Sequence, residues 1–358
     1  MGVNGELSTL EFLYGNCLFL GIIILYNISY HYLNRTRFKD KKLNINPFRL
    51  DDKNINNRVI LSFSLLCTFI FFIYFDFNLE VVFHRKVFLN ESQSFSKPVI
   101  AIINVFRGAP LILFLYYKLN GLKNAYLEIA LIFLIVICNF PTGISRYRVA
   151  VTYLPLFLIY IKPFLKKYNF SSFFIICFLI VFPYLHHFRF NSNVLVNPVN
   201  FGMFLDLHFD SYQNSVNIIM NKIITYGDQL IGVLFFWIPR AIWESKPIGS
   251  SYLLANNLEY QGFSNVAIGF FAEGYINFGI IGIIIFVLLL ALVNSWLDFK
   301  FWFRNNLKSY FIISYLLLIP FEFLILRGSL RSSFANLCGY LFFTYFFYIL
   351  LKIKLLRR

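Results

Sequence analysis

Two basic side chains, Arg240 and Lys246, lie in the densest cluster of polar, aromatic and proline residues in the chain. They are six residues apart, and each stands next to a proline, Pro239 or Pro247. Because proline fixes its own φ angle, the two cations are presented on a backbone that has little entropy to lose on binding. A guanidinium group binds phosphate or carboxylate through two parallel hydrogen bonds. The segment therefore predicts a site for an anionic group. Trp237 and Trp243 either stack on sugar rings or anchor the segment at a membrane surface, and anchoring is favoured for Trp237.

A second candidate site is the segment Glu273–Gly279, which reads Glu-Gly-Tyr-Ile-Asn-Phe-Gly and begins a long apolar run. A carboxylate at the entrance to an apolar run is costly unless it pairs with a cation or reacts. Glu273 is therefore either a general base or the partner that holds an arginine in place. Gly274 and Gly279 have a simpler explanation in close helix packing. The other candidates for the base are Asp210, Glu244 and His187.

The composition requires a membrane around these segments. Hydrophobic residues make up 59% of the 358, phenylalanine occurs 47 times, and the mean hydropathy is +0.67. A soluble domain needs a polar exterior, which such a composition does not provide. The apolar stretches are about twenty residues long and do not alternate, which is typical of membrane helices and not of barrel strands. The five cysteines all fall inside these stretches without a Cys-x-x-Cys pair, so we expect neither disulfides nor a metal site.

We predict an all-α, polytopic bundle of about nine to eleven transmembrane helices, forming a single integral membrane domain over residues 1–358. A further apolar stretch, Gln229–Trp243, is interrupted by Pro239 and Arg240 and is interpreted as a re-entrant or interfacial segment. The seventh span is long enough to tilt, to break or to begin outside the bilayer. The nine predicted spans are 9–33, 58–77, 98–117, 122–139, 149–163, 171–188, 267–297, 309–326 and 333–351.

Basic residues fall mainly on one side of these spans. Because basic loops stay in the cytoplasm, this side is predicted to be cytoplasmic, with the N-terminus outside and the C-terminus inside. The same loops explain the net charge of +15 without a nucleic-acid partner, for which the chain has no recognisable motif. Twenty of the 32 lysines and arginines lie in the segments 34–58, 118–123, 162–167, 300–308 and 352–358.

The twelve basic residues on the other side are mostly arginine. A single arginine there is as readily explained by a lipid headgroup or a nearby acid, but eight together favour an anionic substrate handled outside. Arg107 lies in mid-span, where a charge is costly and is usually functional or paired. The only long hydrophilic segment on this side, Arg189–Val266, is predicted to cover the site. The eight arginines are Arg85, Arg107, Arg146, Arg148, Arg189, Arg240, Arg327 and Arg331.

These motifs, in this order, resemble the O-antigen polymerases, the family that polymerises oligosaccharide repeat units. The resemblance covers the second half of the chain, whereas the first 130 residues match only as hydrophobic helices. In place of the Thr-Gly-Ser-Arg of such proteins, this chain has Ile144 inserted before Ser145-Arg146. The matching segments are Phe236–Arg240 with Trp243 and Lys246-Pro247, Glu273–Gly279, Phe188-Arg189, Thr142–Arg146 and Arg327-Gly328.

The resemblance implies a glycosyltransferase with a helical fold like that of other lipid-dependent glycosyltransferases, one large periplasmic loop (189–266), and a place in the bacterial inner membrane. Its substrate would be an oligosaccharide on polyprenyl (undecaprenyl) pyrophosphate, polymerised for lipopolysaccharide or a capsule, without cofactor or metal. A chain-length regulator is implied as a partner. The resemblance assigns catalytic roles to Arg240, Glu273, Arg189 and Arg146, and substrate binding to Lys246, Arg327, Trp243, Tyr275, Asn277 and Asp210.

Two other functions stay open. A ligase that moves finished glycan from the lipid onto another acceptor would use the same arginines for the same leaving group, although the order of the motifs favours the polymerase. A flippase or transporter of lipid-linked oligosaccharide would require inverted repeats and ionisable groups near the bilayer midplane. The sequence contains no such repeat, and Arg107 is the only midplane charge.

Overall fold

The protein is seen here in a computed structural model, which describes residues 7–38, 57–92, 97–161, 169–181, 211–257, 266–303 and 307–352. Within these ranges the regular elements are helices and none is a strand, which confirms the all-α prediction. Each of the nine predicted spans coincides with helix in the described part of the chain. Five helices are long and apolar enough to cross a membrane: Thr9–Arg37, Ile102–Leu119, Phe270–Phe303, Ser309–Arg327 and Leu330–Lys352.

The other predicted spans correspond to shorter helices. α2 (Asn57–Ile73) and α6 (Ala125–Cys138) are apolar but have 17 and 14 residues. At 1.5 Å per residue, a 14-residue helix is about 21 Å long, less than the roughly 30 Å of a hydrocarbon core. The remaining two are α7 (Arg146–Tyr160) and α8 (Asn169–Ile176), which continues as the π-helix η2 (Cys177–Val181). The structure therefore describes a multi-pass helical protein with five membrane-length helices.

The chain divides into two compact units, which are described separately. Unit 1 comprises Met1–Pro47, Gly202–Asn305 and Glu322–Leu337, and unit 2 comprises Phe48–Phe201, Asn306–Phe321 and Cys338–Arg358. Two helices, α14 (Ser309–Arg327) and α15 (Leu330–Lys352), contribute residues to both units. That the whole chain forms a single membrane domain stays a prediction.

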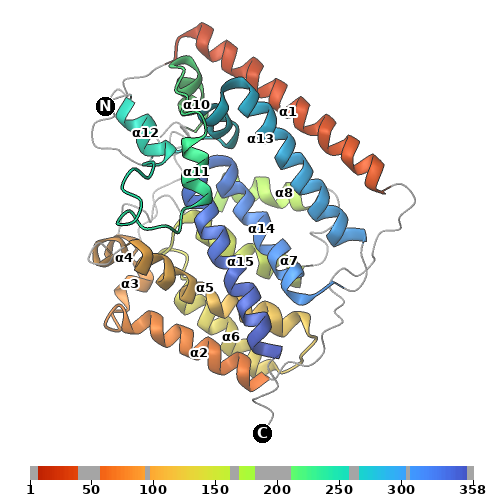
Figure 1. The fold of residues 1–358 in the computed structure, drawn as a ribbon. Helices are drawn as coiled ribbons and strands as arrows, with labels where there is room; N and C mark the ends of the chain where they lie inside the picture. Colours follow the sequence, from red (N-terminus) through yellow and green to blue (C-terminus); the bar gives the residue numbers. More distant parts are fainter. Residues whose placement is uncertain are drawn as a thin grey trace. The chain divides into compact units, whose positions relative to one another are not determined.

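In unit 1, α1 (Thr9–Phe38) and α13 (Phe270–Phe303) lie side by side and run in the same direction (Figure 1). The ring of Phe19 in α1 lies 4.5 Å from that of Phe271 in the first turn of α13. Further along, the Tyr30 hydroxyl donates to the Asp298 carboxylate at 2.5 Å. Parallel helices begin on the same side of a membrane, as the predicted topology requires for this pair.

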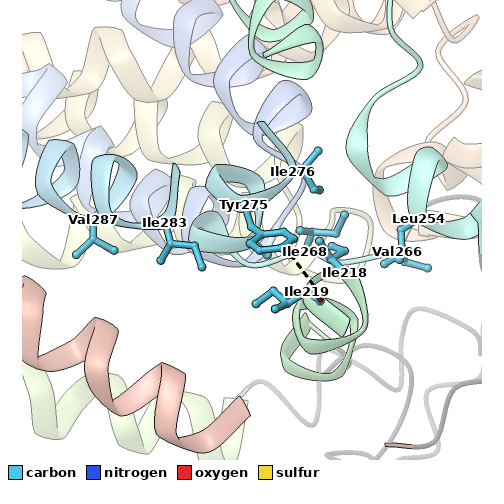
Figure 2. Close-up of a cluster of buried hydrophobic side chains, with 10 residues drawn as sticks. Ile218, Ile219, Leu254, Val266, Ile268, Tyr275, Ile276, Ile283 and Val287 are labelled. Atoms are coloured by element: carbon cyan, nitrogen blue, oxygen red, sulfur yellow. Dashed lines mark hydrogen bonds between the residues drawn. The ribbon is translucent and has the colours of Figure 1, made fainter. Parts of the chain in front are cut away.

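Shorter helices pack on the first part of α13 and form the core of unit 1 (Figure 2). They are α10 (Ser211–Met220), which brings Ile218 and Ile219, and α12 (Ser250–Asn257), which brings Leu254. The Tyr275 hydroxyl of α13 donates to the Ile219 carbonyl at 3.3 Å. This buried cluster fixes α10 and α12 against the start of α13.

The helix α13 breaks at Phe278 and Gly279, as its length allowed. Gly279 has φ 64° and ψ −147°, in the region that favours glycine. Across the break, a Cβ on Gly274 would lie 2.5 Å from the Gly282 carbonyl oxygen, and one on Gly282 would lie 2.0 Å from that of Gly274. Close backbone packing thus explains why residue 274 is glycine, and the segment it packs against, at Gly282, belongs to the same helix.

Unit 2 is built on α2, α6 and α5 (Lys97–Leu119), which pack against one another. Two short helices, α3 (Glu80–Phe83) and α4 (Arg85–Ser92), add Val82 and Phe88 to its core. The α6–α7 link is docked on α3: the Thr142 hydroxyl donates to the Phe83 carbonyl at 2.6 Å, and a Cβ on Gly143 would lie 1.7 Å from the Val82 carbonyl oxygen. The link that carries the Thr-Gly motif is therefore fixed by backbone contact.

Candidate functional site

Two guanidinium groups of unit 1 meet at one carbonyl oxygen. Arg240 donates from Nη2 to the Pro247 carbonyl at 3.0 Å and from Nη1 to the Lys246 carbonyl at 2.7 Å. Arg331, in the first turn of α15, donates from Nη1 to the same Pro247 oxygen at 2.6 Å. We call Arg240, Lys246 and Arg331 the cationic cluster.

Lys246 brings the third charge to the cluster and anchors the backbone beside it. Its Nζ donates to the carbonyls of Phe236 at 2.7 Å and Ile238 at 2.6 Å, and its side chain is only 4% exposed. Burial lowers the pKa of Lys246, and the charges of Arg331 and Arg240 lower it further. The amine therefore holds the turn that leads to Arg240.

The acceptors that the cluster uses are neutral main-chain carbonyls. Among the residues that the structure describes, none of the three cations forms an ion pair. Glu244, between Arg240 and Lys246 in sequence, is exposed and does not pair with them. Because like charges in partly buried surroundings repel at an effective dielectric well below that of water, a bound anion would stabilise the cluster.

The segment that carries Arg240 is a short helix followed by turns. α11 (Asp228–Leu234) has seven residues, about 10 Å of helix, which is too short to cross a membrane. After it, the Phe236 ring packs edge-on against Phe334 at 6.1 Å, while Trp237 is 67% exposed. Trp243 borders the cluster, with the Lys246 Nζ 6.0 Å from its ring centroid. This geometry agrees with an interrupted segment, and anchoring by the exposed Trp237 stays a prediction.

Glu273 is fully buried and both of its carboxylate oxygens are bonded. It accepts a hydrogen bond from the Ser250 hydroxyl and one at 2.9 Å from the Leu330 main-chain N–H. Ser250 is the first residue of α12 and Leu330 the first of α15. A carboxylate is favourable at a helix N-terminus, where main-chain N–H groups lack partners. Glu273 thus holds together the two helix starts that flank Pro247 and Arg331.

The other polar residues of the Glu273–Gly279 motif also bond inside the fold. Asn277 accepts at 2.7 Å from the main-chain N–H of Leu230 in α11 and donates to the Glu273 carbonyl at 2.8 Å. It is 0% exposed, and Tyr275 is 6% exposed. The structure therefore places both predicted substrate-binding side chains in the packing beneath the cluster.

The remaining predicted site residues are not brought to the cluster by the described structure. Arg327 ends α14, and its carbonyl accepts from the Ser211 hydroxyl at 3.4 Å. Arg146 begins α7 and belongs to unit 2. The predictions for Arg189, Asp210 and His187 lie outside the described residues.

Arg331 was not predicted to belong to the site. Its sequence gave one indication, because it is one of the eight arginines predicted to lie outside. Nothing in the sequence connects it with Arg240, which lies 91 positions earlier, whereas Arg331 stands in the first turn of α15. Arg331 and Arg240 are joined through the main-chain carbonyl of Pro247, which a motif of side chains does not reveal.

No protein-family model, no curated protein and no solved structure matches this chain. The fold and the site therefore define only the class of protein. It is an all-helical protein with membrane-length apolar helices and a cluster of cations bonded to main-chain carbonyls.

Proposed function

We propose that the protein is a membrane glycosyltransferase that polymerises oligosaccharide repeat units carried on polyprenyl pyrophosphate. The observation that supports this most directly is the cationic cluster, in which Arg240 and Arg331 share the Pro247 carbonyl without a carboxylate partner among the described residues. Pyrophosphate supplies the negative charge and the several acceptor oxygens that such a cluster lacks. The motifs that resemble the O-antigen polymerases contribute Arg240 and Lys246 to it.

In the proposed reaction, a hydroxyl oxygen of one repeat unit attacks the anomeric carbon of a second glycan chain. The bond from that carbon to the pyrophosphate oxygen breaks, the lipid pyrophosphate leaves, and a base takes the hydroxyl proton. Arg240 and Arg331 stabilise the charge that develops on the leaving group, because their guanidinium groups are already fixed by carbonyl bonds. Removing one such donor costs about 10²- to 10³-fold in rate.

The geometry leads us to assign Glu273 a positioning role in place of the general base. A base must reach the hydroxyl whose proton it takes, whereas the two oxygens of Glu273 are occupied by Ser250 and Leu330 in a fully buried place. Lys246 is likewise a positioning residue, since its amine is bonded to two carbonyls. Of the other candidate bases, Glu244 is exposed in the same segment as Arg240.

The proposed site faces the non-cytoplasmic side of a bacterial inner membrane. Supporting this, α1 and α13 run parallel, and the basic residues Arg35 and Arg37 stand at the same ends of the pair as Lys300. If basic ends are cytoplasmic, then the start of α13, with Glu273, lies at the outer surface.

The test is the glycan displayed by the host after Arg240→Ala and, separately, Arg240→Lys, at matched protein levels. We expect Ala to abolish long glycan while a single repeat unit still reaches the cell's acceptor. Lys should rescue only weakly, because its single nitrogen cannot occupy the positions of both Nη1 and Nη2, which donate to different carbonyls.

Lys222→Ala is the matched control, because it removes an exposed cation of the same unit that is not part of the cluster. It should leave glycan length unchanged. Loss of even the single repeat unit in Arg240→Ala would indicate ligation or flipping in place of polymerisation. Unchanged glycan length would remove Arg240 from the site.

A further inference from the structure

Arg107 in unit 2 is a buried arginine that the proposed reaction does not use. It lies in the middle of the apolar helix α5 and is 1% exposed. Its Nε donates to the Cys138 carbonyl at the end of α6. Among the described residues, neither Nη1 nor Nη2 has a hydrogen-bond partner, although both are buried. A buried charge with unmet donors is strongly destabilising, which demands an explanation.

The surroundings of Arg107 hold its guanidinium in one orientation. Its Cζ lies over the Phe71 ring at 5.1 Å and over the Phe88 ring at 5.0 Å, so aromatic rings from α2 and α4 flank it. The backbone is fixed as well, because Asn139 donates from Nδ2 to the Arg107 carbonyl at 2.9 Å. The guanidinium of Arg107 is thus in contact with two rings and bonded to one carbonyl through Nε, while Nη1 and Nη2 have no hydrogen-bond partner among the described residues.

A second arginine, Arg148, acts on Arg107 through its charge. It stands in the first turn of α7, is half-buried, and donates from Nε to the Tyr147 hydroxyl at 3.2 Å. Its helix packs against α5, and the Tyr153 hydroxyl of α7 donates at 2.8 Å to the carbonyl of Asn139, the residue that bonds the Arg107 carbonyl. The positive charges of Arg148 and Arg107 oppose each other there. No carboxylate of the described chain pairs with either arginine.

The hydroxyl of Tyr340 is pressed against the residue that follows Arg107. A Cβ on Gly108 would lie 2.7 Å from that hydroxyl oxygen, so only glycine leaves room for it. Tyr340 is 6% exposed. Its hydroxyl therefore lies in a buried place, beside the backbone that carries Arg107.

We propose that Arg107 and Arg148 form a second anion site, within unit 2, that binds a phosphate group. Two cations with free N–H donors and an adjacent tyrosine hydroxyl need an acceptor with several oxygens and more than one charge, which phosphate supplies better than a carboxylate. The prearranged fork of Arg107 loses little entropy on binding, and half-buried Arg148 meets the ligand first. This site does not depend on the polymerase reaction.

The alternative is that Arg107 only joins α5 to α6 through the Cys138 carbonyl. The two roles differ in what Arg107→Met does to the empty protein. Replacing an unpaired buried charge by an apolar side chain of similar length is often neutral or stabilising. A phosphate ligand therefore predicts unchanged or higher thermal stability without ligand, whereas a purely structural arginine predicts a loss with and without ligand.

The experiment is calorimetric titration of the full chain in maltoside micelles with inorganic pyrophosphate, in an Arg240→Met background that disables the cationic cluster. We expect pyrophosphate binding to remain, and Arg107→Met to weaken it at least tenfold without lowering the melting temperature of the unliganded protein. Absence of binding in the Arg240→Met background, or binding that Arg107→Met leaves unchanged, would overturn the proposal and leave the proposed function untouched.

Two further arms complete the test. If Arg107→Met does not fold, Arg148→Met replaces it, because a half-buried side chain is easier to substitute. Arg148→Met must then weaken pyrophosphate binding to the same degree. Unchanged binding overturns the proposal.

Phosphatidic acid added to the micelles identifies the source of the phosphate. Competition with pyrophosphate at the Arg107-dependent site indicates a lipid headgroup, and lack of competition indicates a phosphate that is not part of such a lipid.

Discussion

In unit 1 the guanidinium groups of Arg240 and Arg331 are held by main-chain carbonyls, whereas in unit 2 that of Arg107 is flanked by two phenylalanine rings. Carbonyls fix the edge of a guanidinium and leave its faces open. The rings cover the guanidinium and leave its buried Nη1 and Nη2 without a hydrogen-bond partner among the described residues. The first arrangement depends on the path of the backbone, and the second on the packing of side chains.

This difference determines which substitutions should disable each site. The cationic cluster should be sensitive to changes that move the starts of α12 and α15, even when they lie beneath it. The Arg107 site should tolerate such changes and respond to the loss of a ring.

Glu273→Ala should have the largest effect, because it leaves the buried Leu330 N–H and Ser250 hydroxyl without an acceptor. We expect a loss of about 2–5 kcal/mol in the free energy of unfolding and loss of long glycan. Glu273→Gln keeps an acceptor oxygen for Leu330 and should retain most of both. Stability is measured by denaturant unfolding in detergent. A Gln variant that is stable but as inactive as Ala would identify Glu273 as the base after all.

Gly274→Ala should come next, because its Cβ would meet the Gly282 carbonyl, a backbone atom that cannot rotate away. We expect a loss of about 2–4 kcal/mol and loss of long glycan, since the first part of α13 carries Glu273. Gly21→Ala on α1 is the control, because nothing lies within 4 Å of its Cβ. It should be neutral or stabilise by about 0.5–1 kcal/mol. Equal effects of the two would contradict the close contact across the break.

Phe88→Leu should affect the Arg107 site alone. It removes one of the two rings over the guanidinium and should cost about 1–2 kcal/mol in stability. Pyrophosphate binding in the Arg240→Met background should weaken, while glycan polymerisation by the otherwise wild-type protein should change little. Phe133→Leu, at a 63% exposed position of unit 2, should change neither. A loss of binding in both variants would mean that ring packing is not what orients Arg107.

The smallest effect concerns pH. Burial and the two arginines lower the pKa of Lys246 in the folded protein, so the unfolded chain binds this proton more tightly. Protonated Lys246 therefore opposes folding at neutral pH, and this cost disappears as the pH rises through the lowered pKa towards the ordinary lysine value of about 10.4. Arg331→Gln should raise the pKa and reduce this gain in stability. Melting temperatures measured between about pH 8 and 10 test it, with Lys246→Met expected to remove the gain altogether.

The helices were predictable from the sequence because an apolar run long enough for a membrane helix is a local signal. Where the structure describes them, all nine predicted ranges coincide with helix, and the seventh breaks where Gly279 adopts a positive φ. Which helices pair was not predictable. The polar pairs that align α1 with α13, such as Tyr30 with Asp298, join side chains that no periodicity relates.

The candidate site was predictable only in part. The prolines and cations around Arg240 are contiguous in the sequence, and the structure brings Arg240 and Lys246 together as expected. Arg331 joins the site through the main-chain carbonyl of Pro247, 84 residues away. Glu273 caps α15 through the main-chain N–H of Leu330, 57 residues away. Every residue type offers those groups, so a motif of side chains does not reveal them.

The pairing of α1 with α13 also sets the order of events during synthesis. Tyr30 and Asp298 are 268 residues apart. At a synthesis rate of about 5–20 residues per second, α1 waits roughly 13 to 54 s in the bilayer before its partner emerges. Throughout that interval Tyr30 lacks the acceptor, and Tyr26 the donor, that Asp298 and Asn294 of α13 will bring. Helix α1 therefore needs an interim companion, such as an insertion factor, until synthesis has passed Asp298.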